Sequence, residues 1–233
     1  MKTGFFFILL CCYCFSHAQV LTPAGKRELL TAQQDNLETY TDSVIQTGKE
    51  FEIGNLHSAK FTKRTHPFFE SNKWEKGQVI FNGTSYNAQT LKYDIVADRL
   101  IYFKRSPTES FPLALKETFV SDFEINNHHF KYYKGQEMKP GYYEVLAEGK
   151  ATLLVQWRKK ESLSSDGQIA YKTLSTLYLI KQGKYQKVLN LFVLNFMLRD
   201  KRKELKKETN KLSIDYFNKL KAAKTIVEEY NKL

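Results

Sequence analysis

Two adjacent histidines, His128 and His129, are the residues that first suggest metal chemistry. The pattern around them predicts a strand, in which neighbouring side chains point to opposite faces, so the two imidazoles cannot share an ion. His57 and His66 lie nine positions apart and have no cysteine near them, which is not a zinc-ligand spacing. The sequence predicts neither a metal site nor another cofactor.

Catalytic motifs are equally scarce. The chain has no Gly-x-Ser-x-Gly and no Ser-x-x-Lys, and the cluster at 164–166 has the composition of a turn between strands. The segment Gly77 to Gly83 opens no helix and carries no Lys-Ser/Thr, so it does not match a phosphate-binding loop. Asp94 with Asp98, and Glu144 with Glu148, are the nearest paired carboxylates, but nothing in their spacing requires the ~5–9 Å separation across a cleft that glycoside hydrolysis uses. The sequence therefore favours a protein that is not an enzyme.

All three cysteines, Cys11, Cys12 and Cys14, lie in the first 20 residues. A short positive start, an apolar run over 5–15 and small residues before Gln19 are typical of a secretory signal peptide, predicted at 1–18. The run is too short to span a bilayer. Lipidation of Cys12 or Cys14 is the alternative, but neither residue follows a small one. Residues 19–233 then contain no thiol, and we expect an exported protein, either periplasmic or associated with the cell surface or outer membrane.

The net charge is +11, and it is concentrated near the end of the sequence. Residues 198–233 contain eleven Lys and Arg against six Asp and Glu. A basic exported protein is attracted to anionic surfaces, so the expected partners are an envelope protein or an anionic glycan or lipid surface. Export argues against nucleic acid. A lysine-rich helix face that only keeps the protein soluble is the simpler alternative.

The middle of the chain predicts a mainly β domain over 48–189, after a polar, partly helical segment at 19–47. Phe, Tyr, Val and Ile alternate with polar residues, and Asn, Gly, Asp and Pro interrupt them at short intervals. Asn82-Gly83, between two apolar runs, is the strongest hairpin signal. We expect nine or ten strands in an antiparallel meander that forms a sandwich or an open barrel. In the polar segment, Asp42-Ser43-Val44 resembles an envelope O-glycosylation site.

The period changes after Leu189, which predicts a basic helical segment over 190–233. Leu198, Leu205 and Leu212 recur at sevens, and Asp215 is the expected cap of a last helix with an apolar side. This α+β arrangement places helices on the mouth or edge of the sheet. The candidate partner surface combines an aromatic–basic strand with the basic helix: His128, Tyr132, Tyr133, Lys201, Arg202, Lys206 and Lys207.

Several segments together resemble a family of uncharacterised exported proteins of Bacteroidota. The resemblance rests on GKEF at 48–51, the block at 66–102, GYYEVLAEGKATLLVQWRKK at 141–160, LYLIKQGKYQKV at 177–188 and the closing EYN at 229–231. It implies an envelope location and supplies no catalytic residue. We therefore expect a non-enzymatic cell-envelope protein acting as a binding or accessory module. The alternatives are a β-barrel carrier of a small apolar ligand and, less favoured, a hydrolase.

Overall fold

The computed structural model describes residues 54–59, 65–105, 110–135, 138–163 and 167–233. The predictions for the leader at 1–18, the segment at 19–47 with Ser43, and the turn cluster at 164–166 fall outside these ranges. Among the described helices, none is long and apolar enough to cross a membrane.

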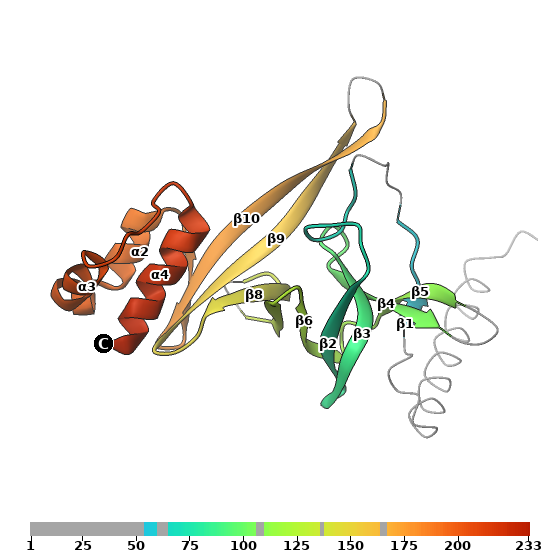
Figure 1. Cartoon of the computed structure of the whole chain (residues 1–233), viewed down its shortest axis with the longest axis horizontal. Helices are drawn as coiled ribbons and strands as arrows, with labels where there is room; N and C mark the ends of the chain where they lie inside the picture. Colours follow the sequence, from blue (N-terminus) through green and yellow to red (C-terminus); the bar gives the residue numbers. More distant parts are fainter. Residues whose placement is uncertain (1–53, 60–64, 106–109, 136–137, 164–166) are drawn as a thin grey trace, which may run out of the picture. The chain divides into compact units, whose positions relative to one another are not determined.

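The described chain forms one antiparallel sheet of eleven strands that is followed by helices (Figure 1). The order across the sheet is β1-β5-β4-β3-β2-β6-β7-β8-β9-β10-β11. The sheet does not close on itself, because β1 and β11 are its two edges. The strands are β1 (Gly54–Leu56), β2 (Glu75–Phe81), β3 (Thr84–Asp94), β4 (Arg99–Arg105), β5 (Ser110–Leu115), β6 (Val120–Ile125), β7 (His128–Tyr133), β8 (Gly141–Ala147), β9 (Ala151–Leu163), β10 (Ile169–Lys181) and β11 (Lys184–Val188). The mainly β, antiparallel prediction is confirmed, with slightly more strands than expected.

Three two-residue turns fix the register of the hairpins. Each has two consecutive residues with positive φ, the geometry of a type I′ turn, which suits the twist of the flanking strands. The turns are Asn82 (49°) with Gly83 (78°), Asn126 (52°) with Asn127 (64°), and Gln182 (52°) with Gly183 (73°). The first of these hairpins is the one that Asn82-Gly83 predicted.

The first part of the sheet must be strongly coiled. Leu115 ends β5 and Val120 begins β6, yet these strands are four positions apart in the sheet. A flat sheet would separate them by about 19 Å, and five extended residues reach at most about 18 Å even without a change of direction. The two strands also run parallel, so the connection has to return toward the start of β6. Strong twist is the way a sheet meets such a constraint.

Aromatic rings fill the interior of this coiled region. Tyr93, Phe123 and Phe130 are almost fully buried, and their ring centroids lie 4.8 to 5.1 Å apart. Phe69 and Tyr142 extend the cluster, each in edge-to-face contact with one of these rings. Aromatic pairs at such separations add to the stabilisation from burial.

The helices follow the last strand and cover one end of the sheet. They are α2 (Leu191–Met197), the 3-10 turn η2 (Arg199–Lys201), α3 (Arg202–Thr209) and α4 (Lys219–Lys232). Their buried side chains join those of β8 to β11 in one core: Ala147, Ala151, Leu153, Val155, Leu177, Leu179, Val188, Leu194, Leu198, Leu205, Ala223, Ile226, Val227 and Tyr230. Helices docked on the sheet were predicted.

One detail of the helical segment was wrong. Asp215 does not cap the last helix; Asn218 does, and its side chain accepts a hydrogen bond from the amide of Lys221. The Asp215 carboxylate instead accepts hydrogen bonds from the amides of Phe217 and Asn218, which forms a local turn. Asp and Asn both make such local bonds, so the type of residue alone does not decide which one becomes the cap.

Candidate functional site

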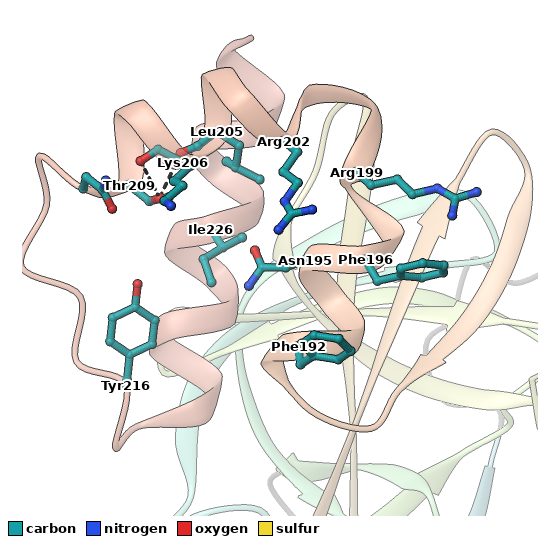
Figure 2. Close-up of a pocket in the computed structure, with 11 residues that line it drawn as sticks. Phe192, Asn195, Phe196, Arg199, Arg202, Leu205, Lys206, Thr209, Tyr216 and Ile226 are labelled. Atoms are coloured by element: carbon teal, nitrogen blue, oxygen red, sulfur yellow. Dashed lines mark hydrogen bonds between the residues drawn. The ribbon is translucent and has the colours of Figure 1, made fainter.

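A groove of about 620 Å³ lies within the helical segment, between α2, α3, α4 and the loop that joins the last two helices. The lining includes Phe192, Phe196 and Tyr216, and Figure 2 shows Ile226 between Tyr216 and Phe192, with Leu205 above it. Leu205 and Ile226 are buried, whereas the three aromatic side chains are more than half exposed. The groove therefore has an apolar floor and an aromatic wall open to solvent.

The sequence of α2 explains why aromatic rings stand at the surface here. Asn190 caps the helix, because its side-chain oxygen accepts a hydrogen bond from the amide of Val193 at 2.9 Å, and α2 therefore begins at Leu191. Helical spacing then places Leu194 and Leu198 on the side facing the sheet, where both are fully buried. The apolar residues of α2 exceed what this side can bury. Phe192 and Phe196 occupy the opposite side.

Three cations stand around the apolar surface: Arg199, Arg202 and Lys206, named here the rim cations (Figure 2). The Arg199 guanidinium lies over the Phe196 ring, 4.5 Å from its centroid. Within the part of the chain that the structure describes, no carboxylate forms an ion pair with Arg202 or Lys206. Two nearby acids are engaged elsewhere, since Asp200 pairs with Lys181 and Glu208 with Lys211. The rim therefore keeps its positive charge.

On the predicted surface of β7, the histidine side chains already have partners within the chain. His128 lies between two carboxylates, with Nδ1 2.5 Å from Glu144 Oε1 and Nε2 3.2 Å from Glu70 Oε1. The hydrogen bond with Glu144 is the main cause that raises the pKa of His128 above its ordinary value, with burial opposing it. On the opposite face of β7, His129 Nε2 lies 2.8 Å from Asp122 Oδ1 of β6. The opposed histidines match the strand prediction.

The two tyrosines of β7 are also packed. Tyr132 and Tyr133 make edge contacts with Tyr142 and Tyr143, at 5.3 and 5.9 Å between ring centroids. Burial raises the pKa of Tyr133 to about 12. Both half-buried rings thus pack against tyrosines of β8.

The predicted basic residues are divided by the structure. Arg202 and Lys206 line the groove, Lys207 is exposed outside its lining, and Lys201 is half-buried in η2. The β7 residues lie between β6 and β8 and contribute nothing to this lining. Sequence reasoning missed the aromatic wall of Phe192, Phe196 and Tyr216. The signal was there, because LFVLNFML at 191–198 is apolar on every side of a helix, more than one docking face requires.

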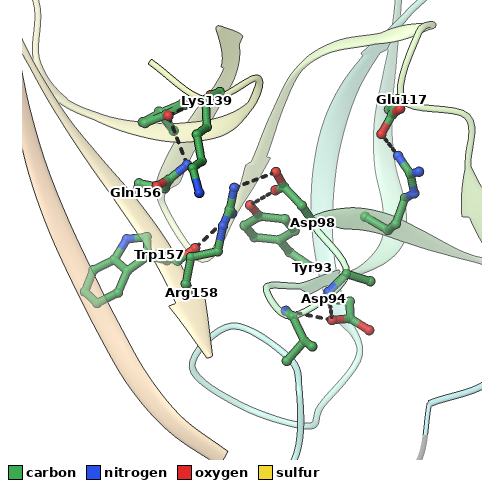
Figure 3. A network of polar contacts seen from close by, with 12 residues as sticks. Tyr93, Asp94, Asp98, Glu117, Lys139, Gln156, Trp157 and Arg158 are labelled. Atoms are coloured by element: carbon green, nitrogen blue, oxygen red, sulfur yellow. Dashed lines mark hydrogen bonds and ion pairs between the residues drawn. The ribbon is translucent and has the colours of Figure 1, made fainter. Parts of the chain in front are cut away.

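Some of the polar contacts in Figure 3 connect segments that are distant in the sequence. Tyr93 donates a hydrogen bond to Asp98 at 2.5 Å, and Arg158 donates one to the other carboxylate oxygen at 2.9 Å (Figure 3). This ties the β3–β4 turn to β9. Burial raises the pKa of Tyr93 well above its ordinary value, so its hydroxyl remains a donor.

The four carboxylates weighed for acid–base chemistry have partners of their own. Asp94 accepts from the amides of Val96 and Ala97, Asp98 binds Tyr93 and Arg158, Glu144 binds His128 and Trp157, and Glu148 binds Lys131. Over the described residues, no group of three or more His, Cys, Asp or Glu is arranged to hold a metal ion. Comparison with protein-family models, curated proteins and solved structures gave no match. The groove in the helical segment is therefore the candidate functional site.

Proposed function

We propose that this chain is a non-enzymatic protein of the bacterial cell envelope that acts as a binding or accessory module through its C-terminal groove. One observation carries the proposal. Ten large hydrophobic side chains are exposed in the described ranges, and six of them lie between 189 and 217: Leu189, Phe192, Phe196, Leu212, Tyr216 and Phe217. An exposed apolar cluster with a polar rim is typical of an interaction site.

The carrier alternative has less support. A carrier keeps interior positions unfilled, as a cavity of at least ~300 Å³ for its ligand. The interior of the coiled sheet instead holds Tyr93, Phe123 and Phe130 in direct ring contact. Aromatic packing of this kind favours a structural role for the sheet, with binding at the surface.

The hydrolase alternative is also weakened by side-chain contacts. A general acid needs a carboxyl whose environment holds it protonated near neutral pH, beside a cleft that admits substrate. Asp98 instead forms an ion pair with Arg158, and Glu144 accepts hydrogen bonds from Trp157 and His128. Both carboxylates are thus occupied by side-chain partners from other strands.

Cell fractionation tests the proposal. The full-length chain, produced with its leader, should be recovered with the envelope. A Phe192→Ser/Tyr216→Ser variant should move largely into the soluble periplasmic or extracellular fraction, because both side chains are exposed and their loss changes the groove without unfolding the protein. Leu56→Ser/Leu163→Ser is the matched control, since it removes two apolar side chains that are equally exposed on the sheet. Recovery of the wild type in the cytoplasm, or of the groove variant with the envelope as before, contradicts the proposal.

A further inference from the structure

We infer that the groove docks on an anionic phospholipid leaflet, with the exposed aromatic side chains entering the acyl boundary and the rim cations contacting lipid phosphates. This inference rests on the proposed function and names the partner of the same site. It depends on two properties of the segment 189–217: how far its apolar side chains protrude, and where its positive charges stand.

The apolar side chains protrude as insertion into a bilayer requires. Phe192 on α2 is 79% exposed, and Phe196 and Tyr216, which line the same groove, are 57% and 59% exposed. A side chain that fills a preformed protein interface is usually set among neighbours, whereas an interfacial anchor extends beyond the surrounding surface. Phe and Leu on one side of a helical segment, with Lys and Arg beside them, are characteristic of elements that lie in the membrane interface.

The charges stand where headgroup phosphates would meet them. Arg199, Arg202 and Lys206 share the groove with Phe196, so cation and aromatic side chain approach a surface together. The Arg199 guanidinium lies over the Phe196 ring, so this cation stands directly on the aromatic wall. Near an anionic leaflet, each such cation strengthens binding by roughly fivefold, and salt screens this attraction.

The opening between the helices fits an acyl chain better than a polar ligand. Its floor is Leu205 and Ile226, both at most 4% exposed. The polar groups at its edge include the Thr209 hydroxyl, which donates within its own helix to the Leu205 carbonyl oxygen at 2.9 Å. An apolar floor beneath cationic edges matches the division of an anionic phospholipid into chain and headgroup.

Vesicle flotation tests the inference on the full-length chain purified from cells that export it. The vesicles are pure phosphatidylcholine in one arm and contain about a third phosphatidylglycerol in the other. We expect binding to the anionic vesicles only. Phe192→Ser/Phe196→Ser should weaken it at least about tenfold, since each ring of the groove contributes roughly that factor on burial. Arg202→Glu/Lys206→Glu should weaken it more than about tenfold at low salt.

Lys160→Glu/Lys172→Glu is the matched control, because it makes the same change of net charge at exposed positions on β9 and β10. It should bind as the wild type does. Equal losses in the control and the rim variant would show a general charge effect and overturn the inference, as would binding that the aromatic variant leaves intact. No binding to either vesicle also overturns it. If the groove variants still lose envelope recovery in that case, the proposed function stands and the partner is a protein or glycan.

Discussion

Asn231 clamps the last helix to the sheet, and its removal gives the sharpest test of how the groove is held. The side-chain amide donates to the Ala151 carbonyl oxygen at 2.9 Å and accepts from the Ala151 amide at 2.8 Å. It also lies tight against the β8–β9 turn, where a Cβ added to Gly149 would come within 2.7 Å of Asn231 Cγ. One side chain thus satisfies both backbone groups of a buried strand residue.

Replacing Asn231 with Ala should lower the free energy of unfolding by about 1–3 kcal/mol. Each of the two hydrogen bonds contributes about 0.5–1.5 kcal/mol net. Because the variant leaves the backbone amide and carbonyl of Ala151 without these partners, we expect the total loss to lie near its upper value of about 3 kcal/mol. Equilibrium urea unfolding measures it, because the midpoint falls while the slope stays constant. Asn195→Ala is the control, since that side chain is exposed on α2 and should change stability by no more than about 0.5 kcal/mol.

Asn231→Asp separates hydrogen bonding from packing. The carboxylate keeps the shape of the amide, but one oxygen then faces the Ala151 carbonyl oxygen without a proton between them. At pH 7 the loss should match or exceed that of the alanine variant. Below pH about 3.9, where a carboxyl is protonated, its O–H restores a donor and the difference from wild type should shrink. A loss under about 0.5 kcal/mol in the alanine variant, or a pH-independent difference for Asp, would refute the clamp.

Three further perturbations test other parts of the structure. The pKa of His128 is raised chiefly by its hydrogen bond with Glu144, so the stabilisation that protonated His128 gives the folded protein is complete below pH about 6.5. This stabilisation is lost as pH rises through the higher pKa of the folded state. Urea midpoints of wild type and His128→Gln should therefore diverge at pH 6 and converge at pH 9, and a constant gap would contradict this. Gly141→Ala should destabilise the protein by more than about 1 kcal/mol in thermal unfolding, because its Cβ would lie 2.3 Å from Asp98 Oδ2. An unchanged midpoint would show that the Asp98 side chain can move away at no cost. Leu205→Ala should cost about 2–5 kcal/mol in urea unfolding, since Leu205 is 4% exposed in the core between helices and sheet, and a loss below 1 kcal/mol would mean that α3 is not docked there.

Local signals in the sequence were sufficient for much of the fold. Asn82-Gly83 and Asn126-Asn127 tolerate positive φ, so they identify hairpins without knowledge of the rest of the chain. The order of strands was not predictable in this way. β6 pairs with β2 rather than with β5, and this follows from coiling of the whole sheet, which no short segment encodes.

The candidate surface shows the same division between local and long-range information. The sequence identified Arg202 and Lys206 by charge, and both line the groove. It also selected His128, whose carboxylate partners Glu144 and Glu70 come from distant parts of the chain. Phe192 was missed because an apolar residue in an apolar helix is expected to be buried. Only the docking direction of α2 shows that it is exposed.

Hydrogen–deuterium exchange of the full-length chain, with and without anionic phospholipid vesicles, measures directly whether the groove contacts the membrane. We expect slower exchange in residues 191–218, which contain α2, α3 and the loop before α4, and unchanged exchange in β7 at 128–133. Protection of β7 with no change in 191–218 would contradict this expectation. Such a result would place the binding surface on β7 and give the helices only a structural role at the end of the sheet.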